Sequence, residues 1–472
     1  MFQTVLELAK NIAEGALSSR AVVERCLTTI ESKNPTLNAF ADVYQDEALS
    51  LADQRDEEAK AGHLRGPLHG VPVGVKDLFY VKDRRTARGS AAFAEFVPVE
   101  TAPIVERLEA AGAIIVGKTT TTEMGWSGSS VSEYYGSTKN PWNAELTSGG
   151  SSSGSASALA SGMVPMTLGS DGGGSVRIPA SFCGHFALKG SLARIPTYPW
   201  SATEMLSHAG PMTLTAADSA LLFDILKGPD PRDHHALPDD GLCYCTTKIE
   251  ISALRVAYAP TLFGVDVDDE VDRVIRDAIE RIEETFDVLI ETVSPDWGDP
   301  IKIFEVLWVA GRGVAYGKQA NGAANGFGSG FANLVKQSGK FDLEDYLGAA
   351  KARAGYAADI HRFFESFDVL LMPTVPILPF DAELEAPAGM GSNSDILPWT
   401  GWTPFTYPFN ITGNPAASIP AGLSSTGMPV GLQVVGRRHS DATVLAFCRD
   451  LEEKAGFFVM SGDLPELVAA VE

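Results

Sequence analysis

The pattern of apolar and polar residues has helical spacing in the first part of this chain, and strand-like apolar runs appear only after it. Up to a break at Gly15, apolar positions recur every three or four residues, which predicts a helix. A second helix is predicted over 22–30, ending before Asn34-Pro35 because proline disfavours helical geometry in the residue before it. A charge-rich helix is expected over 48–61. The first 62 or so residues should therefore be helical.

The following stretch predicts strands and helices in alternation. The apolar run 70–75 predicts a buried strand that ends in Lys76 and Asp77. After it come a helix over 103–111, a strand over 113–116, a small-residue helix to about 161 and a strand over 164–168. Because helices alternate with strands, the expected fold class is α/β.

The second half resumes this alternation after a surface connection at 228–240 that is rich in Pro, Asp and His. Strands are predicted at 255–258, 287–290, 369–372, 417–420 and 431–435, with helices at 271–286, within 302–356 and at the end. The helical stretch is interrupted by the glycine-rich segment 321–331. That segment would suit a lid over a site and a surface excursion equally well.

Charge and composition exclude several classes of partner. The net charge is −23, from 60 acidic and 37 basic side chains, and it disfavours binding to nucleic acid or anionic membranes. No apolar run approaches the roughly 20 residues of a membrane span, and the first helix lacks the apolar core of a signal peptide, so a cytoplasmic protein is expected. The chain has 5 cysteines, which argues for reduced thiols, and the Cys243/Cys245 pair lacks the companions of a metal site.

Residues 112–119 match the phosphate-loop string G-x-x-x-x-G-K-[ST]. In a phosphate loop the middle residues form a turn after a strand, whereas here 113–116 are themselves predicted to be the strand. Nucleotide binding at Lys118 is therefore a minor alternative.

Residues 150–154 match the nucleophile-elbow string G-x-S-x-G, with Ser152 as the nucleophile. That arrangement needs a strand directly before the turn, and 143–149 do not predict one. Four histidines lie downstream, so this also stays a minor alternative; they are His185, His208, His361 and His439.

A stronger pattern joins Lys76, at the end of GVPVGVKD, to Ser151 in SGGSSSGSA and to Ser175 in GSDGGGSVRIPASFCG, at separations of 75 and 24 residues. In these motifs and their spacing, the chain resembles the amidase-signature family of serine hydrolases. Further similar segments are SASALASGMVPMTLGSD, LKGS, GPMTLTAAD, GNPAASIPAG and GMPVGLQVVG. The resemblance extends over nearly the whole chain.

The resemblance implies a single domain with a large mixed sheet covered by helices on both faces. Its expected parts are N-terminal helices (about 1–62), a signature core (about 63–228) and a C-terminal part (about 250–472) that completes the sheet and covers the site. It implies an amidase that cleaves a carboxamide through an acyl enzyme, without cofactor or metal. The implied site residues are the catalytic Lys76, Ser151 and Ser175, the oxyanion donors Gly172, Gly173, Gly174 and Ser175, the supporting Ser152, Asp171 and Arg177, and the substrate-binding Gly125 and Trp126.

Physical chemistry supports these roles one by one. Lysine has an ordinary pKa of about 10.4, so Lys76 must be buried away from anions to act as a base near neutrality. Asp77 should face away from Lys76, because neighbouring side chains on a strand alternate faces. Glycines before Ser175 leave their N–H groups free to approach an oxyanion. The resemblance further implies a cis peptide bond between Gly150 and Ser151. Arg177 is expected to hold the loop, or alternatively to bind a substrate carboxylate.

The substrate stays open at this point. Related glutamine-amidase subunits of tRNA-dependent amidotransferases usually have Gln and Asp where this chain has Ile178 and Thr403, which argues against that alternative. The aromatic segment 397–407 would suit an apolar or aryl acyl group, and would equally suit a core. An aliphatic amide, an aryl acylamide and an aromatic acetamide are all candidates. A noncatalytic binding protein is the remaining rival, and a homodimer is compatible with the resemblance.

Overall fold

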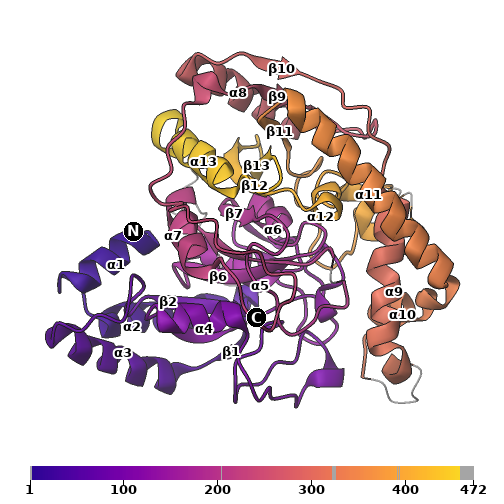
Figure 1. The fold of residues 1–472 in the computed structure, drawn as a ribbon. Helices are drawn as coiled ribbons and strands as arrows, with labels where there is room; N and C mark the ends of the chain where they lie inside the picture. The colour runs from indigo at the N-terminus through magenta and orange to yellow at the C-terminus, as the bar shows by residue number, and fades with distance from the viewer. Residues whose placement is uncertain (1–2, 204, 321–325, 391, 393, 458–472) are drawn as a thin grey trace.

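A mixed sheet of 11 strands forms the centre of the computed structural model, which describes residues 3–203, 205–320, 326–390, 392 and 394–457 (Figure 1). In spatial order the strands are β1 (Phe40–Val43), β3 (Ile114–Thr119), β2 (Pro72–Lys76), β6 (Met166–Asp171), β8 (His208–Thr213), β7 (Phe186–Lys189), β12 (Ala416–Leu423), β13 (Pro429–Gly436), β11 (Val369–Pro373), β9 (Val256–Tyr258) and β10 (Ile290–Thr292). Strands β3, β2 and β6 are parallel, as are β11, β9 and β10, and the middle strands are antiparallel. The predicted α/β class and mixed sheet are confirmed.

Helices cover both faces of this sheet. One face carries α1 (Val5–Ala13), α4 (Pro103–Ala110), α7 (Ala216–Leu226), α8 (Asp269–Phe286) and α13 (Asp441–Ala455). The other carries α2 (Ser19–Leu37), α3 (Gln45–Lys60), α5 (Ser153–Ala160) and α6 (Arg177–Cys183). Beyond them, α9 (Ile301–Ala320), α10 (Ser329–Gln337), α11 (Leu343–Ser366) and α12 (Pro408–Thr412) form a separate wall, mostly orange in Figure 1. Short 3-10 turns lie at Ala91–Phe93, Glu123–Gly125, Ile251–Ala253, Ser338–Lys340 and Pro398–Trp402.

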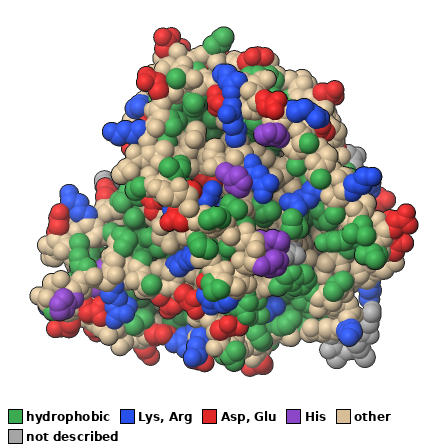
Figure 2. All heavy atoms as spheres, viewed as in Figure 1, with side chains coloured by type: hydrophobic (Ala, Val, Ile, Leu, Met, Phe, Trp, Pro, Cys, Tyr) green, Lys and Arg blue, Asp and Glu red, His purple; other side chains and the backbone are tan. Residues whose placement is uncertain are grey.

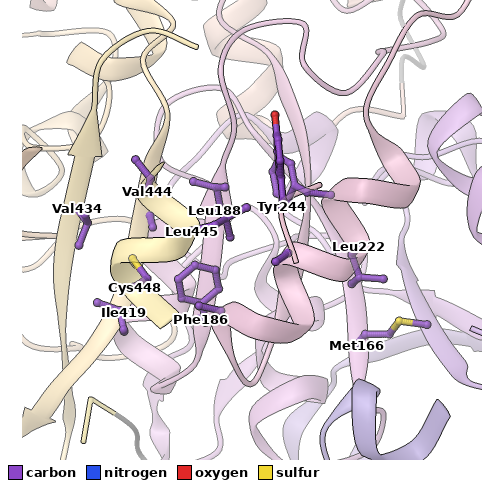
Figure 3. Close-up of a cluster of buried hydrophobic side chains, with 14 of the residues drawn as sticks. Met166, Phe186, Leu188, Leu222, Tyr244, Ile419, Val434, Val444, Leu445 and Cys448 are labelled. Atoms are coloured by element: carbon purple, nitrogen blue, oxygen red, sulfur yellow. The ribbon is translucent and has the colours of Figure 1, made fainter. Parts of the chain in front are cut away.

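The strands are apolar because they are buried on both sides. In β3, Ile115 packs into the core beneath α4 and α7, while Ile114 and Val116 face α2, α3 and α5. Figure 3 shows the first of these cores where Phe186 and Leu188 of β7 meet α13. Covering on both faces explains why these strands read as continuous apolar runs.

The helix α2 continues through Pro35 to Leu37, so the prediction that it ends before Asn34-Pro35 was wrong. Proline lacks the N–H that would bond the carbonyl four residues back, and the helix continues for only two residues beyond it. The Asn34 side chain also accepts the N–H groups of Ala39 (2.8 Å) and Phe40 (2.7 Å), which holds the chain after the helix.

Three strand predictions also need correction. Residues Phe40–Val43, within the stretch that was expected to be helical, form the edge strand β1. Residues Asn143–Thr147 form β5, which pairs with β4 (Lys139–Asn140) in a separate two-stranded sheet. The pattern was missed because the outward side chains of β5 are polar. Strand β10 starts at Ile290, not at Asp287, because Asp287 adopts a left-handed conformation (φ 49°) that ends α8.

Charged side chains of both signs are scattered over the face seen in Figure 2, with no single basic patch on it. Within the described ranges, no helix combines the length and apolar composition needed to cross a membrane. Of the glycine-rich segment 321–331, residues 321–325 lie outside the described residues, so its role as a lid stays a prediction.

Candidate active site

Lys76 is fully buried at the end of β2 and bonds only to neutral oxygens. Its Nζ lies 2.8 Å from Ser151 Oγ, 2.8 Å from Ser152 Oγ and 2.9 Å from Ser170 Oγ. No carboxylate of the described residues forms an ion pair with it. Burial holds the pKa of Lys76 well below its ordinary value, and the charge of Asp171 opposes this only in part. A lysine in this state can act as a base near neutrality.

The parallel pairing of β2 and β6 creates this arrangement. Val75 lies opposite Leu168, so the carboxyl ends of the two strands meet and bring Lys76 beside Ser170. The chain after β6 then turns through glycines to Ser175. A strand end, a loop and a turn that are distant in sequence thus share one edge of the sheet.

Ser151 and Ser175 line the same cavity, which has a volume of about 150 Å³. The Gly150–Ser151 peptide bond is cis, as predicted. The Ser152 N–H donates to the Ser175 carbonyl (3.3 Å), which ties the two loops together. The structure records no hydrogen bond between the two hydroxyls of Ser151 and Ser175. In an enzyme without substrate such bonds are often long and tighten when substrate binds.

The glycines before Ser175 differ in what their N–H groups do. Gly174 donates to Asp171 Oδ1 (2.7 Å) and has a φ of +130°, which favours glycine. The N–H groups of Gly172, Gly173 and Ser175 donate no hydrogen bond to any described residue. A side chain on Gly172 would lie 2.7 Å from the Trp308 ring, so the loop has room only for glycine there. Three of the four expected oxyanion donors are therefore available.

Asp171 and Arg177 hold this loop in place. Arg177 donates to Asp171 from Nε and Nη2 (2.9 Å each) and from its other positions to Thr406 O (2.9 Å), Gln433 Oε1 (2.7 Å) and Asn410 Oδ1 (2.7 Å). Burial alone would raise the pKa of Asp171, but the charge and hydrogen bonds of Arg177 lower it below its ordinary value. Since the fully buried guanidinium is occupied on all sides, the alternative of a substrate-carboxylate ligand does not apply to Arg177.

Of the two expected substrate contacts, only one lines the cavity. Gly125 lines the cavity, with its backbone against Ser151. Trp126 lies outside the cavity lining; its carbonyl accepts the indole N–H of Trp308 (3.2 Å), and its ring packs against Gly330. Trp126 thus supports the cavity wall from behind.

Sequence reasoning missed the outer wall of the cavity. Aromatic and cationic side chains line it, among them Arg88, Trp308, Arg312 and Tyr316. The aromatic segment at 397–407 does not line the cavity: Trp399, Trp402, Phe405 and Tyr407 are all buried in the core behind the glycine loop. The core interpretation of that segment is the one that agrees with the structure.

The two competing motifs have structural roles. Lys118 lies within β3 and bonds Asp77 Oδ1 (2.9 Å) and Thr86 Oγ1 (2.9 Å), so it is not presented to a phosphate. Ser152 does follow a strand, contrary to the prediction, but β5 is not part of the central sheet. Its hydroxyl bonds Lys76 and the Ser170 carbonyl (3.2 Å), and no histidine contacts it among the described residues.

Comparison with known proteins yields consistent matches. Residues 21–445 match the family model described as Amidase. An acylamidase from Rhodococcus erythropolis is 33% identical, with 94% of each chain covered. The glutamyl-tRNA(Gln) amidotransferase of a Synechococcus strain has a component that is also 33% identical, over 96% of this chain and 97% of its own. A solved bacterial aryl acylamidase is similar in fold, with a TM-score of 0.89, 24% identity and 98% of each chain covered.

Proposed function

The chain belongs to the amidase family and is an amide-hydrolysing enzyme, and on this premise we propose that it works through an acyl intermediate on Ser175. In this proposal Ser151 carries the proton between Ser175 and Lys76, which is the base. The observation that supports it most directly is the surroundings of Lys76: a fully buried amine with three hydroxyl partners and no carboxylate partner among the described residues.

The proposed reaction has two halves. In the first, Ser175 Oγ attacks the amide carbonyl carbon while its proton passes to Ser151 and the Ser151 proton passes to Lys76. The C–N bond then breaks, and the nitrogen leaves with a proton returned along the same path. In the second half, water attacks the acyl-Ser175 ester under the same base, and the carboxylic acid is released.

The negative oxygen formed in each half needs donors fixed in advance. Gly172, Gly173 and Ser175 have N–H groups without other partners among the described residues, and the bond from Gly174 to Asp171 fixes the loop that carries them. Arg177 anchors Asp171 in turn. We expect this chain of contacts to supply a rigid oxyanion hole, in which each donor contributes about 10²-fold to 10³-fold in rate.

The residues at two positions behind the glycine loop favour a free-standing amidase over the glutamine-amidase component of an amidotransferase. At the positions that distinguish the two, Ile178 lies against Gly174 and buried Thr403 bonds the Trp399 carbonyl (3.3 Å). Neither offers a charge to the amino group of glutamine. The alternative is that this chain is an amidotransferase subunit, which would hydrolyse glutamine and act together with a partner protein. Glutamine is therefore included among the test substrates.

The test is covalent labelling with a fluorophosphonate, read by intact mass, together with ammonia release from primary amides, anilides and glutamine. Wild type should gain one adduct and turn over amides without added nucleotide or metal. Ser175→Ala should do neither, and Lys76→Ala should label far more slowly. Ser153→Ala is the matched control, because this buried hydroxyl two residues from Ser151 has no hydrogen-bond partner among the described residues. Labelling that persists in Ser175→Ala would overturn the assignment and point to Ser152.

A further inference from the structure

Arg312 is a buried cation on α9 that lines the same cavity as Ser151 and Ser175. Its side chain is 4% exposed. One nitrogen, Nη1, donates to the Trp308 carbonyl (2.8 Å), and the guanidinium lies over the Trp308 ring at 3.8 Å from its centre. Its Nε and Nη2 donate no hydrogen bond to any described residue, and no carboxylate among them forms an ion pair with it.

Arg177 shows what a satisfied buried guanidinium looks like in this protein. It is also buried, but it pairs with Asp171 and its remaining donors bond oxygens. Burial lowers the pKa of Arg312 to about 9, and only the Tyr316 hydroxyl acts against this. Because a guanidinium stays protonated at neutral pH, Arg312 is a buried charge to which the described residues supply no carboxylate.

A second cation faces the same cavity. Arg88 lies over the rings of Tyr80, Phe93 and Phe96, and has no acidic partner among the described residues. Tyr316, which also lines the cavity, is close enough to both arginines that their charges oppose the rise in its pKa caused by burial. The outer wall of the cavity is therefore positive although the whole chain has a net charge of −23.

Trp308 lies between Arg312 and the glycine loop. The edge of its ring is so close to Gly172 that a side chain added there would lie only 2.7 Å away. The guanidinium of Arg312 lies over the face of the same ring. The guanidinium is thus one indole ring from the proposed oxyanion donors. A cavity of about 150 Å³ is smaller than the roughly 300 Å³ or more of a site for drug-sized ligands, so the ligand must be small.

We propose that the substrate of this enzyme is a small amide that carries a carboxylate, and that Arg312 binds that carboxylate while Ser175 attacks the amide carbonyl. This inference rests on the proposed function. A monoamide of a short dicarboxylic acid carries both groups on a molecule small enough for a cavity of about 150 Å³. Arg312 is then a specificity-determining residue, and Arg88 adds to the positive potential without a direct bond.

The test compares paired substrates with equal numbers of carbons, of which one ends in a carboxylate and the other in a methyl group: succinamate against butyramide, and glutaramate against valeramide. In wild type, kcat/KM should be at least about tenfold higher for the acidic member of each pair. Arg312→Gln should lower kcat/KM for the acidic amides by about 10²-fold or more and leave the neutral amides within threefold, since only the former lose an ionic hydrogen bond. Arg312→Lys should recover part of the loss. The control is Arg276→Gln, an exposed arginine on α8.

A measurement on wild type alone covers the case in which Arg312 variants do not fold. Succinate should slow fluorophosphonate labelling of Ser175, whereas 1,4-butanediol at the same concentration should not. If succinate gives no protection and acidic amides have no advantage, Arg312 has a structural role only and the inference is wrong. If Ser175 is not labelled at all, the proposed catalytic mechanism itself fails, so the two failures are distinguishable.

Discussion

Two lysines lie on neighbouring parallel strands, equally buried, and their surroundings differ in one respect. Lys76 on β2 bonds only serine oxygens, whereas Lys118 on β3 forms an ion pair with Asp77 at 2.9 Å. Burial lowers the pKa of both, and for Lys118 the charge and hydrogen bond of Asp77 act against it. The difference between them indicates that burial lowers the pKa of a lysine further where no carboxylate of the described residues is paired with it.

The strand geometry produces this difference from adjacent residues. Lys76 and Asp77 follow each other in sequence, and their side chains leave the strand in opposite directions. Asp77 accordingly accepts hydrogen bonds from Lys118 Nζ, the Tyr135 hydroxyl and the Arg88 backbone N–H, and none from Lys76. Asp77 thus forms an ion pair with Lys118 and none with Lys76.

Replacing each lysine in turn should change kcat by very different amounts, and this is the largest effect that we expect. We expect Lys76→Ala to lower kcat by about 10²-fold to 10⁴-fold, the range that a positioned base contributes. Lys118→Met should change kcat much less, because Lys118 touches no part of the cavity. Steady-state kinetics on folded protein, checked by circular dichroism, measures both. Equal losses in the two variants would contradict the division of roles.

Stability should respond in the opposite order. Lys118→Met leaves Asp77 buried without its cation, and we expect the free energy of unfolding to fall by about 3–5 kcal/mol. Lys76→Met removes an unpaired amine and should destabilise far less. Urea unfolding of the two variants and of Lys118→Met/Asp77→Asn checks this. The double variant should regain part of the loss, and a further drop would mean that Asp77 is held by other contacts.

The pH dependence of kcat/KM should report Lys76 alone. Because the amine must be neutral to accept a proton, activity should rise about tenfold per pH unit and level off above the lowered pKa of Lys76. Between that pKa and the ordinary value the unfolded chain binds a proton that the folded chain lacks, so this group makes stability rise with pH. The rate profile of Lys118→Met should overlay that of wild type; a shifted limb would show that the second lysine influences the base.

The sequence indicates the proposed catalytic side of the cavity more clearly than the outer side. Backbone geometry constrains the glycines, the serines and the spacing of the segments that contain Lys76, Ser151 and Ser175. Their motifs can therefore be recognised from the sequence alone. Arg312 lies in a stretch that was correctly expected to be helical, but nothing in a helix of mixed pattern tells which face meets a cavity. That depends on how α9 packs against the glycine loop, which only the fold determines.

Local exceptions have the same origin. Pro35 disfavours a helix by its own chemistry, yet α2 continues past it to Leu37, and the Asn34 side chain binds the N–H groups of the two residues that follow the helix and its cap. Polar β5 is a strand only because β4 lies beside it. In both cases a neighbouring group outweighs the intrinsic preference of the residue.

The smallest expected effect tests whether the two lysine sites are independent. The Tyr135 hydroxyl donates to Asp77 Oδ2 (2.6 Å), and burial together with the Asp77 charge keeps its pKa above the ordinary value, so it remains a donor. Tyr135→Phe should lower the free energy of unfolding by about 1.5–3 kcal/mol, the contribution of a hydrogen bond to a charged group. It should leave kcat within twofold, because Asp77 faces away from Lys76. A loss of kcat well beyond twofold in stable protein would mean that the charge on Asp77 does reach the base, and the contrast between the two lysines would then be one of degree.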